Sequence, residues 1–472
     1  MHLKDWANRR IHGDIDVIET LREGLDDAQV ARRTGLPIAS VEGVRTFYGL
    51  LDGADSRTCT GTACSFARGW APPPGAEVRC VGRCYQAPTK LAPGDFPIPA
   101  MSMVPVPVVL RGVLGPPSDP HGDAYELPAP DQIIPRIEAS GLRGRGGAAY
   151  PTAAKWRAAA KAASTTKYVV ANGDEGDPGS FVDRLLLERD PHAVLAGMNA
   201  CAAAIGATHG VVYIRGEYPR AIEIMRDAIH EARDRLLPGF DVVVHVGAGS
   251  YVCGEETALL RGIEGLRAEP SPKPPYPAER GLHGKPTVVQ NVETLSIIPW
   301  LLRSGLRPDT KGFSLSGAVA RPGAIEASFG TPLRTLIDDG GGGVAPGRRF
   351  KMALVGGPLG TVIPAHELDT PLTFHAMPGM GHGGIVVLDD SVSARTLAEH
   401  LFGFAAAESC GNCTPCRVGT AQLARMPDAA ALARLMDTLE AGSLCGFGAS
   451  VPRPIRDLLR HFPDEMFAER AP

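Results

Sequence analysis

Hydrophobic residues recur at helical spacing along the first part of the chain. Ile18, Leu21 and Leu25 fall on one face of a helix, because residues three and four positions apart share a helix face. A second helix is expected over Asp27–Arg33, with Asp27 as its cap, and a third over Pro37–Tyr48, since proline suits a first turn. We predict helices without catalytic groups of their own here.

The pattern then breaks into short pieces around a group of cysteines. Glu77–Cys80 and Val104–Leu110 have the composition of strands. Pro105 and Pro107 cannot donate to a sheet ladder, so the second strand is expected at an edge. The proline- and glycine-rich stretch 115–122 is predicted to be a linker.

Strand and helix patterns alternate in the middle of the chain. Lys167–Asn172, Val211–Ile214 and Val242–Val246 are apolar runs of strand length, and Tyr218–Ile229 has the spacing of an amphipathic helix. Such alternation is typical of an α/β domain with a parallel sheet.

The last part of the chain changes character twice. Residues 310–390 are β-rich and suggest a small α+β module, and from Ser393 the pattern is helical, with Leu397, Leu401 and Phe404 on one face. The predicted domain boundaries are 1–50, 51–115, 125–305, 306–392 and 393–472.

Composition excludes several classes of protein. The chain has 472 residues, 44% of them hydrophobic, and a net charge of −4, which gives no support for nucleic-acid binding. Ala193–Ile214 is the most apolar stretch, but Asn199 and Gly206 interrupt it, so a buried helix followed by a strand is expected there rather than a membrane span. With no signal-peptide pattern at the N-terminus, we expect a soluble, cytoplasmic protein.

Eight of the ten cysteines form two groups of four, and Cys201 and Cys253 stand apart. In a cytosolic chain such spacing indicates metal binding rather than disulfides. The C-terminal group is Cys410, Cys413, Cys416 and the distant Cys445. Three cysteines at three-residue steps with a fourth from another segment are typical of a [4Fe–4S] cluster. A Cys₄ zinc site and unliganded thiols are the alternatives.

The N-terminal group has different spacing. Cys59 and Cys64 are separated by four residues and Cys80 and Cys84 by three. Two such pairs suit a [2Fe–2S] cluster, in which each iron takes two thiolates. Zinc, or a site that no longer holds a cluster, is the alternative.

Glycines and charged residues gather in two loops. Gly144, Gly146 and Gly147 lie beside Arg143 and Arg145, just before a predicted helix start at Pro151 or Thr152, with Lys155 one turn further on. Exposed backbone N–H groups, a helix N-terminus and positive charge suit a phosphate. A structural turn is the alternative.

The second loop is acidic. It runs from Asn172 through Asp174, Glu175 and Asp177 to Ser180, directly after a strand, and α/β sheets bind ligands at the carboxyl ends of their strands. Its carboxylates suit hydrogen bonds from ribose hydroxyls or a flavin ring, although a solvated turn is the alternative. Further polar candidates follow at Tyr251, Gly254, Glu255, Glu256, Lys273, Tyr276, Gln290, Asn291 and Thr294.

Taken together, these motifs resemble the flavin-containing NADH-oxidising subunit of respiratory complex I. Its relatives include diaphorase subunits of NAD-linked hydrogenases and of molybdenum- or tungsten-dependent formate dehydrogenases. The resemblance covers residues 125–472, through the loops at 141–147, 172–180 and 251–256 and the cysteine turn at 408–416. The stretch 1–112 resembles the neighbouring thioredoxin-like [2Fe–2S] subunit of complex I, here fused in front.

The resemblance implies an architecture. It is a multidomain α/β protein with N-terminal helices, a trimmed thioredoxin-like unit, a Rossmann-like FMN domain, a ubiquitin-like β-grasp insert of the soluble-ligand-binding type and a C-terminal helical bundle that holds a [4Fe–4S] cluster. The thioredoxin-like unit is expected to be trimmed because the stretch between Cys64 and Cys80 is short for that family.

The resemblance also implies residue roles. FMN is expected at Gly144, Arg145, Gly146, Gly147, Lys155, Asn172, Asp174, Tyr251, Gly254, Glu255, Asn291 and Thr294. NAD(H) is expected over the flavin against Tyr150, Lys273, Tyr276 and three carboxylates assigned to the catalytic site, Glu175, Asp177 and Glu256. The metal ligands are expected to be Cys410, Cys413, Cys416 and Cys445 for the [4Fe–4S] cluster and Cys59, Cys64, Cys80 and Cys84 for the [2Fe–2S] cluster.

The expected activity is hydride exchange between NAD(H) and FMN, with single electrons passing to the clusters, because a flavin converts between two-electron and one-electron carriers. Complex I subunits usually carry Glu where this chain has Asp177. Asp is common at this position in the soluble hydrogenase and formate dehydrogenase branches, so it favours these two over complex I without separating them. The beta subunit of an NAD-dependent Mo/W formate dehydrogenase is the first expectation, an NAD(P)-linked hydrogenase the second and complex I the third. A zinc-stabilised assembly subunit is the non-enzyme alternative.

Overall fold

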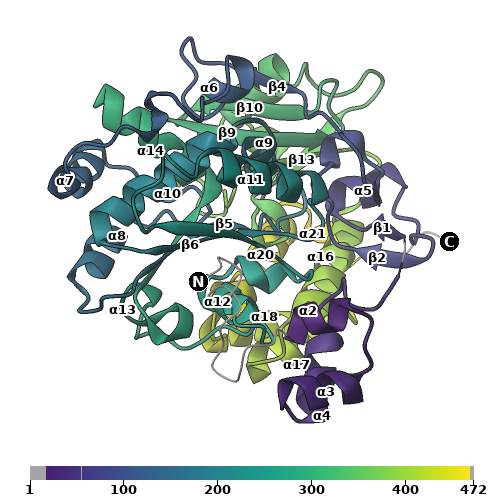
Figure 1. The fold of residues 1–472 in the computed structure, drawn as a ribbon. Coiled ribbons are helices and arrows are strands. Elements are labelled where there is room, and N and C mark those ends of the chain that lie inside the picture. Colours follow the sequence, from purple (N-terminus) through teal and green to yellow (C-terminus); the bar gives the residue numbers. More distant parts are fainter. Residues whose placement is uncertain (1–16, 55, 468–472) are drawn as a thin grey trace.

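Three β-sheets and their covering helices make up the computed structural model, which describes residues 17–54 and 56–467 (Figure 1). A four-stranded sheet lies at the centre, a six-stranded sheet beside it and a three-stranded sheet near the N-terminal cysteines. Within the described ranges, no helix has both the length and the apolar character needed to cross a membrane.

Three short helices open the described chain: α2 Val17–Arg22, α3 Asp27–Thr34 and α4 Ile38–Arg45. They confirm the helical spacing, with two corrections. The cap of α3 is Asp26, which forms a capping box with Gln29, and Pro37 precedes α4 as its cap rather than starting its first turn. The part of the predicted helical segment before Val17 lies outside the described residues.

These helices dock on the central domain through the segment that follows them. The backbone N–H groups of Gly49 and Leu50 donate to the carbonyls of Gly249 (2.8 Å) and Ala248 (3.0 Å). Tyr48 donates its hydroxyl to the carbonyl of Leu266 at 2.7 Å. The N-terminal helices are therefore fixed against the loop that follows β7 Asp241–Val246, an edge strand of the central sheet.

The N-terminal cysteines sit on a small sheet. Strand β1 Arg57–Cys59 pairs in parallel with β2 Ala76–Val78 and antiparallel with β3 Lys90–Leu91, and α5 Thr62–Ala67 and the 3₁₀ turn η1 Cys84–Gln86 complete the unit. The predicted strand over Val104–Leu110 is wrong. Its two prolines remove ladder donors, and the N–H groups of Val108, Val109 and Leu110 donate instead to the buried carboxylate of Glu326.

The central sheet is parallel, in the order β7–β6–β5–β8. Its strands are β5 Tyr168–Gly173, β6 His209–Ile214, β7 Asp241–Val246 and β8 Thr287–Asn291. The three strands predicted in this region are confirmed. The apolar stretch Ala193–Ile214 forms most of helix α10 Pro191–Ile205 and then β6, so the prediction of a buried helix followed by a strand is also confirmed.

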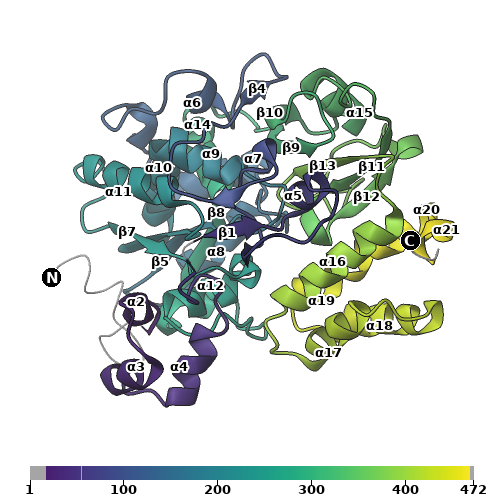
Figure 2. The ribbon, with the colours of Figure 1, turned by 90° about the vertical axis from the view of Figure 1, so that its right-hand side faces the viewer.

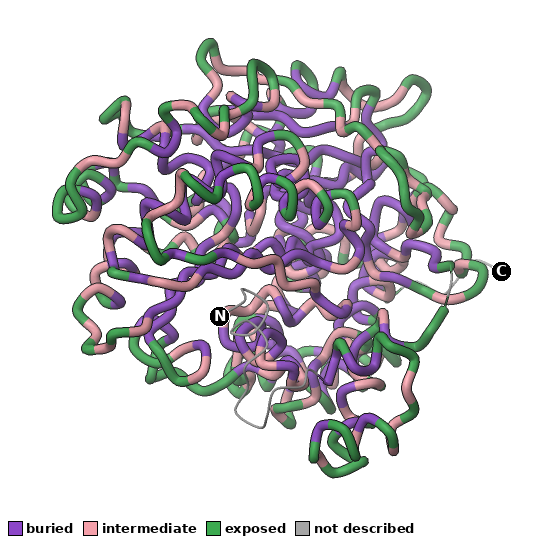
Figure 3. The backbone as a smooth tube through the Cα atoms, viewed as in Figure 1, coloured by how far each residue is buried: buried purple, intermediate pink, exposed green. Residues whose placement is uncertain are grey.

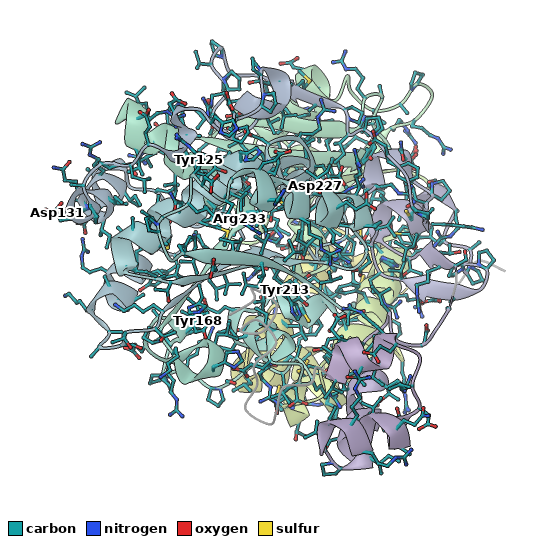
Figure 4. All side chains as sticks on the ribbon, in the orientation of Figure 1. Tyr125, Asp131, Tyr168, Tyr213, Asp227 and Arg233 are labelled. Carbon is teal, nitrogen blue, oxygen red and sulfur yellow. The ribbon has the colours of Figure 1, made fainter. Side chains whose placement is uncertain are left out.

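Helices cover both faces of this sheet, and its side chains alternate between two cores. Tyr168 and Tyr213 point to the face of α12 Glu256–Ile263, whereas Val169 and Val212 point to the face of α10. Figure 4 shows both tyrosines on one side of the sheet, and Figure 3 shows β5 and β6 largely buried. The helices of this domain are α7 Pro130–Ser140, α8 Thr152–Lys161, α9 Val182–Arg189, α10 Pro191–Ile205, α11 Pro219–Glu231, α12 Glu256–Ile263, α13 Pro277–Arg280 and α14 Val292–Ser304.

The six-stranded sheet has the order β12–β11–β13–β9–β10–β4. Most of it comes from the predicted module: β9 Thr310–Gly317, β10 Gly323–Ser328, β11 Phe350–Val355, β12 Thr361–Pro364 and β13 Gly384–Asp389, with the short helix α15 Leu333–Thr335. Its edge strand, β4 Ala100–Ser102, comes from the N-terminal part and pairs in parallel with β10. The α+β character is as predicted, and the β-grasp topology stays a prediction.

The C-terminal region is helical, as predicted. It comprises α16 Ala394–Glu408, α17 Thr414–Leu423, α18 Ala429–Gly442, α19 Gly446–Ser450, α20 Pro452–His461 and α21 Pro463–Met466. Figure 2 shows these helices together, below the sheet that carries β11 and β12. Ion pairing of Lys351 on β11 with Glu465 on α21 (2.8 Å) joins the two parts.

Candidate active site

A cavity of about 850 Å³ opens at the carboxyl ends of β5 and β8, where parallel sheets bind ligands. Its volume is in the range of cofactor sites. Its lining joins segments that are far apart in the sequence: Gly144, Gly146, Tyr150, Lys155, Asn172, Gly254, Glu255, Glu256, Lys273, Tyr276, Gln290, Asn291, Leu444, Cys445 and Gly446 are among its residues. The structure therefore brings most predicted FMN and NAD(H) residues to one cavity.

The glycine loop forms a tight cradle on one wall. The N–H of Gly144 donates to the carbonyl of Tyr150 (2.9 Å) and closes the loop. A Cβ at Gly146 would lie 3.1 Å from the Cβ of Asn291 and 3.3 Å from Nε2 of His382. Gly147 has a φ of +112°, which favours glycine. A larger residue at Gly146 or Gly147 would therefore displace the loop backbone that is predicted to bind the phosphate.

Arg145 supports this loop in a way that the sequence pattern did not predict. Its backbone N–H donates to Oγ1 of Thr294 (2.9 Å), but its buried guanidinium donates to the carbonyl of Pro308 (2.7 Å) and lies 4.5 Å from the ring centre of Phe329. The positive charge is thus directed into the neighbouring module and away from the cavity. The cations that line the cavity wall are Lys155 and Lys273.

Two lysines and two glutamates form a charged network in the wall. Lys155 Nζ lies 3.1 Å from Glu256 Oε2, and Lys273 Nζ lies 2.7 Å from Glu255 Oε1 and 3.0 Å from Glu256 Oε1. Burial alone would raise the pKa of Glu256, but the two lysines outweigh it and lower that pKa. The network is therefore charged and keeps polar, ionised groups at the cavity surface.

Other polar atoms in the wall fit a bound heteroaromatic ligand. Gln290 Oε1 is buried and has no hydrogen-bond partner. Asn172 Nδ2 donates to the carbonyl of Gly254 at 3.0 Å and fixes that loop. Tyr150 and Tyr276, which are expected to lie against NAD(H), are each 54% exposed. The cradle, the unpartnered amide oxygen and the exposed aromatic rings together fit a flavin nucleotide.

The acidic loop lies behind the cavity. Asp174, Glu175 and Asp177 are buried and are not among the residues that line it. Glu175 accepts hydrogen bonds from the N–H groups of Asp183 and Arg184 at the start of α9, and burial raises its pKa to about 7. Of the three carboxylates assigned to catalysis, only Glu256 lines the cavity wall.

Asp177 and His382 form a second buried contact behind the glycine loop. Asp177 accepts a hydrogen bond from the hydroxyl of Tyr251 (2.5 Å), and burial raises the pKa of Asp177 to about 6. His382 Nδ1 lies 3.6 Å from Asp177 and has no hydrogen-bond partner. Burial lowers the pKa of His382 to about 3, so its ring is neutral. Sequence reasoning missed His382, and its place in the glycine-rich run 379–384 was the available signal.

A buried ion pair holds the glycine loop from beneath and was also missed. Lys311 is fully buried and lies 2.8 Å from Glu293, and its ammonium also donates to the carbonyl of Arg145 (3.2 Å). Asp183 accepts from the side chain of Asn291 (2.6 Å) and from the N–H of Glu293 (3.0 Å). Side chains of the inserted module and of the central domain thus fix one loop.

The C-terminal cysteines converge beside the cavity. Cys413 caps the N-terminus of α17, and Cys416 lies in the first turn of that helix. Cys445 caps α19. Gly411, with a φ of +81°, allows the turn between Cys410 and Cys413. Burial, with a smaller contribution from the other cysteines, raises the pKa of the Cys416 thiol to about 12. A positive group would stabilise the Cys416 thiolate, and the N-terminus of α17 adds favourable charge.

This cysteine turn is tied directly to the cavity wall. Asn412 Nδ2 donates to the carbonyl of Pro270 (2.9 Å), and the guanidinium of Arg267 donates to the carbonyl of Cys410 (2.5 Å). Pro270 and Cys445 both line the cavity. A cluster held by these cysteines would therefore lie directly beside any ligand bound in the cavity.

The N-terminal cysteines are all buried and lie against the acidic loop. The sulfurs of Cys80 and Cys84 are 3.5 Å apart. Arg215 donates to the carbonyls of Cys80 (2.9 Å) and Glu175 (2.6 Å), which links the two segments. Hydrogen bonding to the Cys59 thiol, together with burial, raises the pKa of Cys80 to about 12. A positive group would therefore be needed to hold Cys80 as a thiolate.

Sulfur spacing separates zinc from an iron–sulfur cluster. A zinc ion with bonds of about 2.3 Å holds four sulfurs about 3.8 Å apart. Among the described residues, the one group of three or more histidine, cysteine or carboxylate ligand atoms within 4.8 Å of one another is His366, Glu367 and His461. No three sulfurs of either cysteine group lie mutually within that distance.

Comparison with known proteins agrees with this geometry. Residues 137–300 match the Nuo51 FMN-binding domain, and residues 396–469 match the iron–sulfur binding region of NADH-ubiquinone oxidoreductase F. The chain is 41% identical to the F 2 subunit of NADH-quinone oxidoreductase from Rhizobium meliloti over 373 residues, which cover 72% of this chain and 89% of the relative. It is 40% identical to the HndC subunit of the NADP-reducing hydrogenase of Solidesulfovibrio fructosivorans, over 71% of this chain and 75% of that one.

A solved structure covers still more of the chain. A chain of an NAD⁺-reducing [NiFe]-hydrogenase in the H₂-reduced state aligns with a TM-score of 0.86 at 29% identity. The alignment covers 98% of this chain and 94% of that one. The likeness therefore includes the N-terminal cysteine unit, which both matched family regions leave out.

Proposed function

The chain belongs to the family of the FMN-binding, NADH-oxidising subunit of complex I, the F-type component of NADH-quinone oxidoreductase, and from this premise we propose that it is a diaphorase subunit. In this role it exchanges hydride between NAD(H) and FMN and passes single electrons to or from iron–sulfur clusters. FMN, when bound, supplies the conversion between two-electron and one-electron transfer.

One observation carries the proposal. The cavity wall contains both the glycine cradle at Gly144 and Gly146 and the cysteine Cys445. A redox ligand in this cavity lies next to a cluster ligand, which short-range electron transfer requires. A merely structural metal site needs no such neighbour.

We propose that the residues of the cavity bind FMN and NAD(H) and orient the two molecules. We assign the FMN phosphate to the backbone of the glycine loop and to Lys155, and the flavin ring to the surfaces of Asn172, Gly254 and Asn291. We assign NAD(H) to the more exposed part of the cavity, against Tyr150, Lys273, Tyr276 and Glu256. Asp174, Glu175, Asp177 and Tyr251 do not line the cavity and are assigned to supporting its wall from behind. Thr294 fixes the glycine loop by accepting a hydrogen bond from the N–H of Arg145.

NAD(H) is proposed as the substrate in preference to NADP(H). A 2′-phosphate would meet the carboxylates Glu255 and Glu256 in the cavity wall and be repelled. Asp177 does not contribute to this repulsion, because it is buried and hydrogen-bonded to Tyr251. Glu256 therefore carries the argument. A ratio of kcat/KM for NADH over NADPH well above ten supports this assignment, and a ratio near one contradicts it.

We also propose that the N-terminal cysteines hold a [2Fe–2S] cluster in a trimmed, thioredoxin-like unit fused in front of the flavin domain. The support is the close pair Cys80 and Cys84, the burial of all four thiols and the alignment of the hydrogenase chain over the N-terminal part. An iron content of about six per chain fits one [4Fe–4S] and one [2Fe–2S] cluster. An iron content near four, with zinc in the N-terminal unit, contradicts it.

Two partners are proposed for the complete enzyme. The Asp at position 177 and the fused N-terminal unit favour a formate dehydrogenase or a hydrogenase over complex I, and of these two we place an NAD-dependent Mo/W formate dehydrogenase first. A specific observation favours a second candidate, an NAD(P)-linked hydrogenase, because hydrogenase chains are among the relatives and one of them aligns over almost the whole length. Subunits that co-purify with molybdenum or tungsten support the first, and subunits that carry nickel support the second.

Visible absorption and turnover test the enzymatic function itself. Protein reconstituted anaerobically with iron, sulfide and FMN is expected to be yellow-brown, to release FMN on denaturation and to reduce ferricyanide with NADH. A colourless protein after reconstitution contradicts this function and supports a zinc-stabilised assembly subunit instead.

A further inference from the structure

A group of metal-ligating side chains lies outside both cysteine groups, at the junction of the six-stranded sheet and the C-terminal helices. His366 and Glu367 belong to the turn η7 Ala365–Glu367, directly after β12, and His461 is the last residue of α20. One ligand atom from each lies within 4.8 Å of the other two. We infer that these three residues form a binding site for a divalent transition-metal ion, with Zn²⁺ as the best-matched ion.

The chemistry of the ligand set supports this ion. Two imidazoles and one carboxylate are a typical three-ligand set for zinc, with water in the fourth position. Zinc bonds of about 2.0–2.2 Å keep ligand atoms about 3.3 Å apart. Nε2 of His461 already lies 3.6 Å from Oε1 of Glu367, and the rings of His366 and His461 are 5.3 Å apart at 63°. The set therefore needs only a small contraction to enclose an ion.

The two elements that supply the ligands are fixed against each other without a metal. Asp457 on α20 accepts a hydrogen bond from the N–H of Val362 on β12 (3.1 Å), and Arg453 donates to the carbonyl of Leu359 (3.0 Å). Figure 2 shows α20 beside the sheet that carries β12. The His461 side chain is only 6% exposed, whereas that of Glu367 is 36% exposed. The site is thus preorganised on one side and open to solvent on the other.

Arg460 occupies the position of a competing cation. Its Nε lies 3.1 Å from Nε2 of His461, and its guanidinium pairs with Asp457 at 3.1 Å. The side chain is 62% exposed, so it can turn into solvent at little cost. Removal of this guanidinium is expected to free the imidazole nitrogen of His461 and to tighten metal binding. No such gain in affinity is expected if the three side chains lie together by coincidence.

An ion at this site would join the inserted sheet to the last helices of the cluster region. The whole cysteine turn lies between Glu367 and His461 in the sequence. The ion would therefore act as a cross-link that restrains the C-terminal helices relative to the sheet. This inference is independent of the flavin and cluster assignments, because none of its ligands lines the cavity.

Zinc titration of the full chain tests the inference. The protein is used after iron–sulfur reconstitution and dialysis against a chelator, so that the cysteines are occupied, and Zn²⁺ binding is measured by calorimetry. We expect one zinc per chain, weakened at least tenfold in His366→Ala and in the isosteric Glu367→Gln, and tightened in Arg460→Ala. The exposed His375→Ala is the matched control and is expected to bind zinc as the wild type does.

Two outcomes overturn the inference. The first is the absence of zinc binding at 100 µM in both the wild type and Arg460→Ala. The second is equal affinity in His366→Ala, Glu367→Gln and the wild type, which would mean adventitious binding elsewhere. Because His366 is exposed, its variant is expected to fold and to retain NADH oxidation, so a loss of zinc is not attributable to unfolding.

Discussion

Glu255 and Cys445 line the same cavity, and the charge of Glu255 adds to burial in raising the pKa of the Cys445 thiol. Glu255 caps helix α12 in the central domain, whereas Cys445 caps α19 in the C-terminal region. The positions of these two residues show that the predicted flavin site and the predicted cluster site border the same cavity.

Cys413→Ser is expected to separate the two halves of the reaction. Loss of one thiolate prevents assembly of the [4Fe–4S] cluster, but Cys413 is not among the residues that line the cavity. Stopped-flow absorbance should show FMN reduction by NADH within a factor of about three of wild type, whereas electron delivery to the partner subunit falls at least a hundredfold. Cys201→Ser, in α10 and outside both groups, is the control. Loss of FMN reduction in Cys413→Ser would contradict the assigned roles.

Lys273→Met is expected to weaken NADH binding. Lys273 bridges Glu255 and Glu256 at 2.7 and 3.0 Å. Without it, Glu255 loses this cation and only Lys155 still pairs with Glu256, so the wall becomes more repulsive to an anionic nucleotide. Charge-assisted hydrogen bonds are worth about 1.5–3 kcal/mol, so KM for NADH should rise about tenfold or more, with a smaller change in kcat. The exposed Lys161→Met is the matched control. An unchanged KM would remove Lys273 from the binding site.

Gly146→Ala is expected to weaken FMN binding. The new methyl group would lie 3.1 Å from Asn291 and 3.3 Å from His382, and overpacking of this kind costs about 1–3 kcal/mol. FMN affinity, measured by fluorescence quenching, should fall about tenfold. Gly403→Ala in α16 introduces a methyl group with nothing within 4 Å and should leave FMN affinity unchanged. Equal affinities in the two variants would show that the loop does not hold FMN.

Glu175→Gln is expected to change how stability depends on pH. Burial raises the pKa of Glu175 from 4.5 to about 7, so the folded protein binds the proton more tightly than the unfolded chain does. Stability from this group is present below pH 4.5 and is lost as the pH rises towards 7. The melting temperature of the wild type should therefore fall relative to that of Glu175→Gln between pH 5.5 and 7, and the difference should be constant above pH 7.5. Parallel curves across the whole range would contradict this.

Much of the central domain could be predicted from the sequence because its signals are local. The apolar runs at β5, β6 and β7 have strand length, and the interruptions by Asn199 and Gly206 correctly argued against a membrane span in that stretch. The cysteine groups were also recognisable from spacing alone. Hydrophobic spacing indicates which residues are buried, and cysteine spacing indicates which cysteines can bind one metal site together.

The remaining features depend on partners distant in the sequence. The N–H groups of Val108, Val109 and Leu110 are satisfied by Glu326, more than two hundred positions away, so strand composition there was misleading. The charge of Arg145 suggested a phosphate contact, but its guanidinium is directed to Pro308 in the neighbouring module. His382 reaches the glycine loop from just before β13 of the other sheet. Contacts between residues so far apart in the sequence leave no trace in the local hydrophobic pattern.

Crystallographic anomalous scattering at the iron and zinc edges, on protein reconstituted with iron, sulfide and FMN, tests the central claim most directly. We predict iron signal between Cys410, Cys413, Cys416 and Cys445, with flavin density in the adjoining cavity between Gly146 and Lys155. Zinc signal at those cysteines, or a cavity without flavin density beside an assembled cluster, would contradict the account.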